Sequence, residues 1–508
     1  MYSKNAPFRY DFVGSFLRPA PIKAARAAFA AGELDAAGLK EVEDREIRKL
    51  ISRQKAAGYH TITDGEFRRS YWHLDFMWGL QGLQEITLDH GYIFHGEETT
   101  PGSVQVVGKI SGENHPFVEH FKFVKQFEDD NTVARQTIPA PAQLYAELFR
   151  EDNGKATRAV YPDDDALLSD IAAAYRQVIA DLYAAGCRNV QLDDCTWGMF
   201  CDAGYQQFLA STGAKLEDQA EKYLQLNNAA LEGKPADLVV TTHVCRGNYH
   251  STWASSGGYA PIAPILFAKA HVDGFYLEFD DARSGDFAPL QFVAPGKKVV
   301  LGLVTTKSPV LEDPEAVKAR IAQAAELVPL ENLCLSPQCG FASCEIGNKL
   351  TDDEQWAKLD LVRTIARPYY LAGGDRDDLL QEGMIGLYKA TRDFRGDKLS
   401  SFRAFAELCI TRQIITAIKT ATRQKHIPLN SYVSLNKPVY EDESDRTLQD
   451  ILAGIRVSDP EELVISREEF NDIELKMNEI LSDLEWQVLT AYLDGKSYNE
   501  MSRQLHRH

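Results

Sequence analysis

Short runs of β-branched and aliphatic residues alternate with amphipathic helical stretches from about residue 11 to residue 365. Each run ends in polar or charged residues, and helical periodicity follows it, as in residues 164–185 and 313–327. Alternation of this kind is typical of parallel strands joined by crossover helices. The clearest runs are YHTITD (59–64), NVQLD (189–193), DLVVTTH (237–243), GFYLE (274–278), KVVLGLVT (298–305) and NLCLS (332–336).

With six or more candidate strands in about 350 residues, this part predicts an α/β fold, the (β/α)₈ TIM barrel. A doubly wound sheet is the second choice. In a barrel the carboxyl ends of the strands meet on one face, where active sites are built. Acids at these ends could be only helix N-caps, but capping does not account for histidine or cysteine. The residues at strand ends are Asp64, Glu66, Asp193, Asp194, His243, Cys245, Glu278 and residues 336–339.

The pattern changes after about residue 366. Strand signals stop, and residues 375–425 are predicted to be helical, with six Lys or Arg against one acid, Glu407, between 398 and 425. An acidic, loop-like stretch and a last acid-rich helical part follow. We therefore predict a barrel over 1–366, helices over 367–432, a linker over 433–459 and a second helical segment over 460–508. No low-complexity linker separates the barrel from the helices.

Composition and charge narrow the classes of protein. A hydrophobic fraction of 44% and a charged fraction of 25% are ordinary for globular proteins. No apolar run reaches membrane-spanning length, and Lys23 and Arg26 interrupt the one Ala-rich stretch near the N-terminus, so we expect no membrane partner and a cytoplasmic location. The net charge of −19 argues against non-specific nucleic-acid binding by the whole chain and leaves a local basic stripe open.

Histidine, cysteine and glutamate at the strand ends suggest a metal site. His243 and Cys245 are two residues apart at one strand end, so their side chains point the same way. Glu278 and Cys339 end later runs. An imidazole, two thiolates and a carboxylate suit zinc, and so electron-rich a site favours binding a substrate thiol over splitting water. The alternatives are an ordinary strand end and an inert buried cysteine, and none of the eight cysteines forms a CxxC pair.

Six segments resemble, in order, the cobalamin-independent methionine synthase family. The resemblance spans about residues 8–365 and is to the catalytic barrel of the long enzyme and to its short single-barrel relatives. It implies a (β/α)₈ barrel. The segments are VGSFLRP (13–19), TDGEFRRSYW (63–72), VQLDD (190–194), THVC (242–245), YLEFDDARS (276–284) and SPQCGF (336–341).

The resemblance also implies a reaction and its residues. The reaction is zinc-dependent methyl transfer from a donor such as 5-methyltetrahydrofolate to a thiol, homocysteine, giving methionine. The zinc ligands would be His243, Cys245, Glu278 and Cys339. Gly14 and Ser15 match the loop that holds the amino-acid moiety, and Glu66 and Asp193 match the carboxylates that bind its ammonium group.

The methyl donor is less well determined. A tertiary amine leaves only when its nitrogen is protonated, so the reaction needs a general acid. Where the long enzyme has its proton-donating histidine, this chain reads LVTTKSP, which places Lys307 there. Lys307 could donate a proton only if its own pKa were lowered, or it could instead bind an anionic substrate. Because the long enzyme's N-terminal barrel has no counterpart here, the donor could instead be a methylcorrinoid or a simpler methylated compound.

From about residue 367 the chain resembles bacterial RNA polymerase sigma factors of the sigma-H type. The resemblance implies that 378–394 docks on the polymerase core and that 410–423 reads the promoter −10 element. Residues Arg412, Thr416, Lys419 and Arg423 are three or four apart and form one helix face for DNA, although such a stripe is commonly only a solvated face. The matching segments are 373–394, 401–430, 434–438 and 483–502.

The sigma-like segment is expected to be incomplete. The first helix of region 2 is almost absent, and 497–505 match only the first helix of a helix-turn-helix, so recognition of a −35 element is not expected. Leu408 and Cys409 replace the paired tryptophans of primary sigma factors, which predicts weak promoter melting. We favour a thiol methyltransferase that carries this segment. The alternatives are a transcription initiation factor with an accessory barrel, and a chimeric reading frame whose two activities were never coupled.

Overall fold

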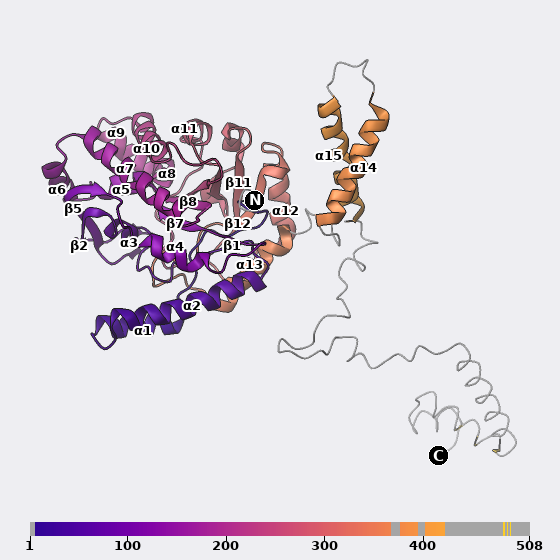
Figure 1. Cartoon of the computed structure of the whole chain (residues 1–508), viewed down its shortest axis with the longest axis horizontal. Helices are drawn as coiled ribbons and strands as arrows, with labels where there is room; N and C mark the ends of the chain where they lie inside the picture. The colour runs from indigo at the N-terminus through magenta and orange to yellow at the C-terminus, as the bar shows by residue number, and fades with distance from the viewer. Residues whose placement is uncertain are drawn as a thin grey trace. The chain divides into compact units, whose positions relative to one another are not determined.

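The computed structural model describes residues 6–366, 376–394 and 402–421, and the single positions 481, 482, 485 and 488. By internal contacts the chain divides into two compact units, residues 1–420 and 421–508. The first unit contains a barrel and a pair of helices (Figure 1). Among the described residues, no helix combines the length and the apolar character needed to cross a membrane.

Parallel strands close a (β/α)₈ barrel, as predicted. Six of them form one sheet in the order β12-β11-β10-β9-β8-β7. β6 continues into β7 across Arg135 and pairs with β1, and Tyr10 bridges Leu335, which brings the N-terminal segment beside the last strand. The barrel strands are β1 (Thr61–Ile62), β6 (Val133–Ala134), β7 (Gln136–Pro139), β8 (Asn189–Asp194), β9 (Val239–Val244), β10 (Gly274–Glu278), β11 (Lys298–Val304) and β12 (Leu333–Pro337).

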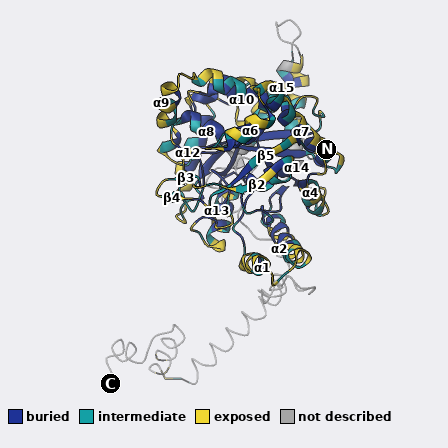
Figure 2. Cartoon of the chain, turned by 90° about the vertical axis from the view of Figure 1, so that its left-hand side faces the viewer, coloured by how far each residue is buried: buried dark blue, intermediate teal, exposed yellow. Residues whose placement is uncertain are grey.

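Helices surround the strands (Figures 1 and 2). Several begin at a carboxylate that accepts a backbone N–H of the first turn: Asp35 before α2, Asp163 before α7 and Asp313 before α12. The helices are α1 (Ala20–Ala30), α2 (Ala36–Ala56), α3 (Leu74–Trp78), α4 (Phe117–Lys125), α5 (Pro141–Glu147), α6 (Asn153–Val160), α7 (Asp164–Ala184), α8 (Thr196–Cys201), α9 (Ala203–Ser211), α10 (Leu216–Ala230), α11 (Ala263–Lys269), α12 (Pro314–Ala324) and α13 (Asp352–Ala366).

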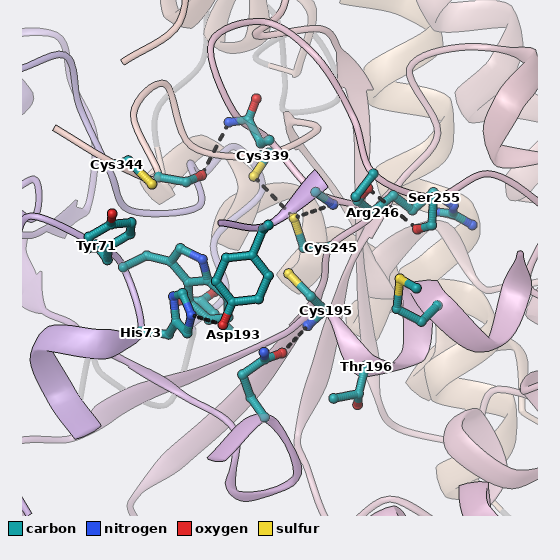
Figure 3. A pocket seen from close by; sticks show the side chains of 18 of the residues that line it. Tyr71, His73, Asp193, Cys195, Thr196, Cys245, Arg246, Ser255, Cys339 and Cys344 are labelled. Atoms are coloured by element: carbon teal, nitrogen blue, oxygen red, sulfur yellow. Dashed lines mark hydrogen bonds between the residues drawn. The ribbon is translucent and has the colours of Figure 1, made fainter. Parts of the chain in front are cut away.

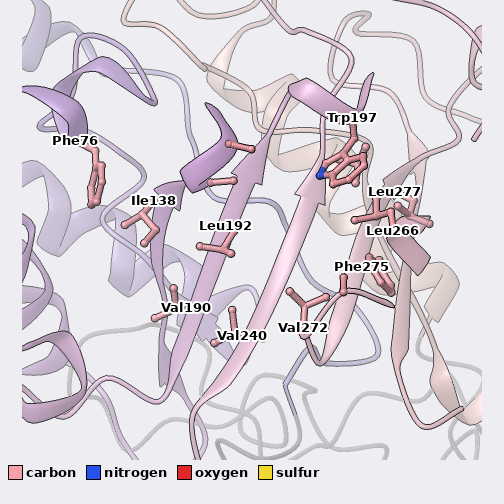
Figure 4. Close-up of a cluster of buried hydrophobic side chains, with 14 of the residues drawn as sticks. Phe76, Ile138, Val190, Leu192, Trp197, Val240, Leu266, Val272, Phe275 and Leu277 are labelled. Atoms are coloured by element: carbon pink, nitrogen blue, oxygen red, sulfur yellow. The ribbon is translucent and has the colours of Figure 1, made fainter. Parts of the chain in front are cut away.

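Each strand divides its side chains between the barrel interior and the helices, because successive residues point to opposite faces. Phe275 and Leu277 of β10 belong to the large cluster between strands and helices, part of which Figure 4 shows. Tyr276 between them packs inside the barrel with Val300. The same alternation places the side chain of Glu278 on the interior side of the last position of β10.

A buried ion pair crosses the barrel interior. Arg135 lies 3.3 Å from Asp11, and its guanidinium donates a hydrogen bond of 2.6 Å to the Tyr276 hydroxyl. That hydroxyl donates in turn to Asp11 at 2.8 Å. The charges therefore neutralise each other where no water is available, which is the condition for burying them.

An insertion that the sequence did not predict lies between β1 and β6. It consists of α3, the antiparallel pair β2 (Gln81–Thr87) and β5 (Gly102–Ser111), and the small hairpin β3 (Ile93–Phe94) and β4 (Glu97–Glu98). His95, in the turn of that hairpin, stacks on Trp253, and Phe94 lies 5.3 Å from Tyr249, centroid to centroid. The hairpin thus packs against the loop that follows β9, at the carboxyl ends of the strands.

The helical pair consists of α14 (Arg376–Asp393) and α15 (Phe402–Ala421), within the stretch predicted to be helical. Gln413 donates to Glu382 at 2.7 Å and accepts from Lys389 at 2.6 Å, which ties the two helices together. A side chain at Gly386 would lie 2.6 Å from the Ile410 backbone, so glycine permits the close approach of the helices at this point.

Candidate metal centre and cavity

The four predicted metal ligands come together at the carboxyl ends of the strands. His243 lies near the end of β9, with Cys245 just beyond it, Glu278 ends β10, and Cys339 follows β12. One donor atom from each lies within 4.8 Å of the others, and all four residues are buried. The two sulfur atoms are 3.7 Å apart. Residues almost a hundred positions apart in sequence thus form one compact donor set.

The unpartnered atoms of this cluster fit a bound cation. Neither ring nitrogen of His243 nor Oε2 of Glu278 has a hydrogen-bond partner among the described residues, although all three atoms are buried. A hydrogen bond with Cys195 raises the pKa of the Cys245 thiol well above its usual range, and the bond with Cys245 does the same for Cys339, with burial adding in both cases. A divalent cation would reverse these effects, and a histidine, two cysteines and a carboxylate fit zinc.

A cavity of about 470 Å³ opens beside the cluster, and Cys245 and Cys339 line it (Figure 3). His243 lines it as well. Among the residues predicted to bind the substrate, Ser15, Glu66 and Asp193 line the same cavity. Three of the predicted ligands and three of the predicted substrate residues therefore share one space.

Three other predicted site residues are not among those that line the cavity. Glu278 is the fourth donor residue, with a carboxylate oxygen within 4.8 Å of the other three donor atoms. Gly14 packs so closely that a side chain there would meet the Thr137 methyl group at 2.8 Å. Lys307 follows β11, and its Nζ is buried without a hydrogen-bond partner among the described residues. The structure therefore does not bring Lys307 to the cavity.

Glu66 has an unusual backbone and an unpartnered oxygen. Its φ of 61° lies in the left-handed region, and Asp64 holds it there by accepting from the Glu66 N–H at 2.8 Å. Oε1 accepts from the Thr137 hydroxyl at 3.0 Å and lies 3.3 Å from Arg69, whereas Oε2 is buried without a partner among the described residues. Strained residues of this kind cluster at functional sites.

Asp193 is the second carboxylate of the cavity. Gln191 donates to its Oδ1 at 2.8 Å, and burial, followed by the nearby Glu66, raises the pKa of Asp193 well above its usual range. Burial likewise raises the pKa of Glu66. Two acids that burial penalises so strongly form a site that a cation such as an ammonium group would stabilise. The adjacent Asp194 accepts instead from Thr196 and Asn227, so it has a structural role at the start of α8.

Several cavity residues were missed by the sequence reasoning. Cys195 directly follows β8 and hydrogen-bonds Cys245, and its position after a strand was the available signal. His73, Tyr92 and Glu147 also line the cavity. They come from the unpredicted insertion and from α5, and nothing in their spacing marks them as neighbours.

The predicted DNA-contacting stripe is only partly described. Arg412 and Thr416 are exposed on α15, and the Thr416 hydroxyl donates to the Arg412 carbonyl at 2.7 Å. Lys419 belongs to the same helix. Arg423 lies outside the described residues. The exposed face contains a basic residue, but the structure does not assign it a partner.

Known proteins match the barrel over its whole length. The family model described as the catalytic domain of cobalamin-independent synthase matches residues 10–367. The uncharacterized protein YxjH of Bacillus subtilis is 43% identical over 364 residues, covering 72% of this chain and 95% of the relative. A Listeria monocytogenes protein assigned as a vitamin B12-independent methionine synthase is 40% identical, with a TM-score of 0.57 over 73% of this chain and 99% of that one. A Shewanella B12-independent methionine synthase, 18% identical with a TM-score of 0.54, shares the fold.

A different family matches the C-terminal part. The model for sigma-70 region 2 matches residues 357–424. The RNA polymerase sigma-H factor of Bacillus licheniformis is 70% identical over 149 residues, covering 29% of this chain and 67% of the relative. The two family models overlap at residues 357–367, most of which lie in α13.

Proposed function

The chain belongs, through residues 10–367, to the cobalamin-independent synthase family, and on this premise we propose that it transfers a methyl group to a thiol, homocysteine, to give methionine. The observation that supports this most directly is the cluster of His243, Cys245, Glu278 and Cys339 beside a cavity that also contains two buried acids. Zinc held by these four residues would lower the pKa of a substrate thiol and so supply a reactive thiolate.

The two acids of the cavity would select the thiol. Glu66 and Asp193 both lie in surroundings that favour their neutral forms, and Oε2 of Glu66 has no partner among the described residues. An ammonium group between them would compensate both charges and satisfy that oxygen. Ser15, with Gly14 behind it, would form the adjoining wall for the rest of the amino-acid moiety. Lys307 does not line the cavity, so it has no part in this proposal.

A comparison of two thiols tests the assignment. Zinc content and methyl transfer from 5-methyltetrahydrofolate would be measured for the full chain with homocysteine and with 4-mercaptobutyrate, which lacks the amino group. We expect one zinc per chain. We also expect a kcat/KM for homocysteine at least about 100-fold higher than for 4-mercaptobutyrate, because the amino group would make a buried, charge-assisted contact. In Glu66→Gln and Asp193→Asn this preference should largely disappear. Equal rates for the two thiols in the unmodified protein would refute the ammonium site, and absence of zinc would refute the metal assignment.

A second candidate function is supported by the C-terminal part. Its 70% identity to sigma-H over 149 residues leads us to propose that α14 binds the polymerase core and that α15 contacts the −10 element, with Arg412 and Thr416 on the contacting face. Capture of purified core polymerase by the full chain tests the first point. Arg412→Ala should then reduce binding to −10 DNA without changing core binding, since a phosphate or base contact is lost. If Arg412→Ala changes neither, the stripe is only a solvated face.

A further inference from the structure

A chain of buried hydrogen bonds lies on the cavity wall and has no part in the metal cluster. His73 Nε2 is 2.9 Å from the Tyr92 hydroxyl, and that hydroxyl donates to Oε2 of Glu147. Oε1 of Glu147 accepts from Ser103 and, at 3.2 Å, from Arg150. Three donors, one of them a guanidinium, favour the ionised carboxylate, although burial raises the pKa of Glu147. His73, Tyr92, Glu147 and Arg150 all line the cavity that His243, Cys245 and Cys339 also line.

The hydrogen bonds determine the tautomer of His73. A tyrosine hydroxyl has a single proton, and Tyr92 donates it to Glu147. The Tyr92 oxygen can therefore only accept from His73, so the proton of the neutral imidazole is on Nε2. Nδ1 then has a free lone pair, and it is buried without a hydrogen-bond partner among the described residues. The carboxylate acts through the hydroxyl in the way that a carboxylate acts directly on a catalytic histidine.

The surroundings of His73 keep it neutral until a proton is delivered. Burial, followed by the positive charge of Arg150, lowers the pKa of His73 to about 3. The ring packs beside Trp72, at 4.6 Å between centroids, and against Tyr71 and Tyr92, and the Tyr92 hydroxyl links it to Glu147. At neutral pH the side chain is thus unprotonated, with Nδ1 able to accept a proton, and once protonated it is a strong acid.

We propose that His73 carries the proton of the methyl transfer: Nδ1 takes the proton that the thiol loses on binding and returns it to the leaving group of the methyl donor. This inference rests on the proposed function. For an amine donor the S–H and N–CH₃ bonds break, and the S–CH₃ and N–H bonds form, so atoms and charge balance with no oxidant or reductant. A thiolate and an imidazolium in one buried cavity also stabilise each other.

Tyr92 and Glu147 are positioning residues in this scheme. They fix the tautomer, hold the ring against Trp72, and stabilise the imidazolium through Nε2–H. The place of His73 on the cavity wall distinguishes it from Lys307, which does not line the cavity. The sequence required a general acid and offered only Lys307 by resemblance, and the insertion supplies another candidate at the site itself.

Proton counting tests the first half of the proposal. Homocysteine would be titrated calorimetrically into the zinc-loaded full chain at pH 7 in buffers of different ionisation enthalpy, which gives the protons released to solvent per thiol bound. We expect well under one proton for the unmodified protein, because the thiolate that forms on binding would hold the proton on His73 as an imidazolium, and about one for His73→Gln. Tyr92→Phe keeps the ring and should change the count in the same direction. His115→Gln is the matched control, since His115 is buried, has a pKa lowered to about 4, and is not among the residues that line the cavity.

A comparison of methyl donors tests the second half. His73→Gln should lose about 100-fold or more in kcat with 5-methyltetrahydrofolate, with little change in KM for homocysteine, as for loss of a general acid. With methyl iodide, whose leaving group takes no proton, the rate of His73→Gln at pH 9 should stay within about twofold of the rate of the unmodified protein. Equal proton release in all variants, or equal loss with both donors, would overturn the proposal. Failure of the unmodified protein to bind homocysteine would instead overturn the proposed function.

Discussion

The barrel and the helical pair differ in what they bury. The barrel encloses large side chains, among them Trp197, Tyr259 and Phe12. In α14 and α15 the buried side chains among the described residues are two alanines, Ala390 and Ala406. Met384 and Tyr388, in contrast, are 62% and 66% exposed.

Sequence identity does not follow this difference. The matches are 70% identical to sigma-H in the C-terminal part and 43% identical to YxjH over the barrel. High identity therefore includes helices in which Met384 and Tyr388 are exposed among the described residues, and lower identity is found over the barrel with its large buried side chains. Identity alone does not measure whether a segment packs a core of its own.

The largest expected difference between the regions concerns cysteine. Cys339→Ser should abolish zinc retention and lower methyl transfer by about a thousand-fold or more, because one of the four proposed zinc ligands is lost. Cys409→Ser, in α15, should change neither. Zinc analysis and the methyl-transfer assay would measure both.

Cys334→Ser is the control inside the barrel. Cys334 is buried, and burial raises the pKa of its thiol to about 11, but it does not belong to the cluster. The Cys334→Ser protein should therefore retain its zinc. Full activity of a zinc-free Cys339→Ser protein would contradict the metal assignment.

Paired leucine substitutions sharpen the comparison in stability. Leu359 in α13 is fully buried, so Leu359→Ala should lower the free energy of unfolding of the barrel by about 2–5 kcal/mol. Leu408 in α15 is 46% exposed, and Leu408→Ala should change stability by no more than about 0.5 kcal/mol. Denaturant unfolding followed by tryptophan fluorescence would measure both, and similar losses would show that α15 packs more than the described residues indicate.

The smallest expected effect is a gain in thermal stability on replacing Asp193. Burial raises the pKa of Asp193 in the folded protein, so the protonated form is favoured there. The stability from this group is present below the unfolded pKa of about 3.9 and is lost as the pH rises through the folded value. Asp193→Asn should therefore match the unmodified barrel near pH 4 and melt about 2–4 °C higher near pH 8, if about 1 kcal/mol is recovered. Scanning calorimetry without thiol would test this, and an advantage that shrinks with rising pH would contradict it.

Much of the barrel could be predicted because its strands are continuous apolar runs. The run 274–278 coincides with β10, and 298–305 differs from β11 by one residue. Their ends also identified the four donor residues, since parallel strands bring their carboxyl ends to one face.

The rest depended on contacts that leave no local pattern. β6 and β7 are short and interrupted by Arg135, which faces a charge across the barrel and so breaks the apolar run. In the insertion β2 pairs with β5 across the intervening hairpin β3–β4, a pairing that no local pattern reveals. His73 and Tyr92 become neighbours only through it, and the mostly aromatic and apolar residues around His73 (SYWHLDFMW, 70–78) gave no sign of its place in the cavity.

The helix α13 sets where this chain can be divided. Both family matches include residues 357–366, yet Leu359, Val362 and Ile365 are buried in the barrel core. A fragment designed from the start of the sigma-70 match would take this helix away from the barrel and expose the surface it covers on β12. A fragment ending at residue 366 would keep it. The division that preserves a folded barrel is therefore about ten residues later than the one that sequence similarity to sigma factors would suggest.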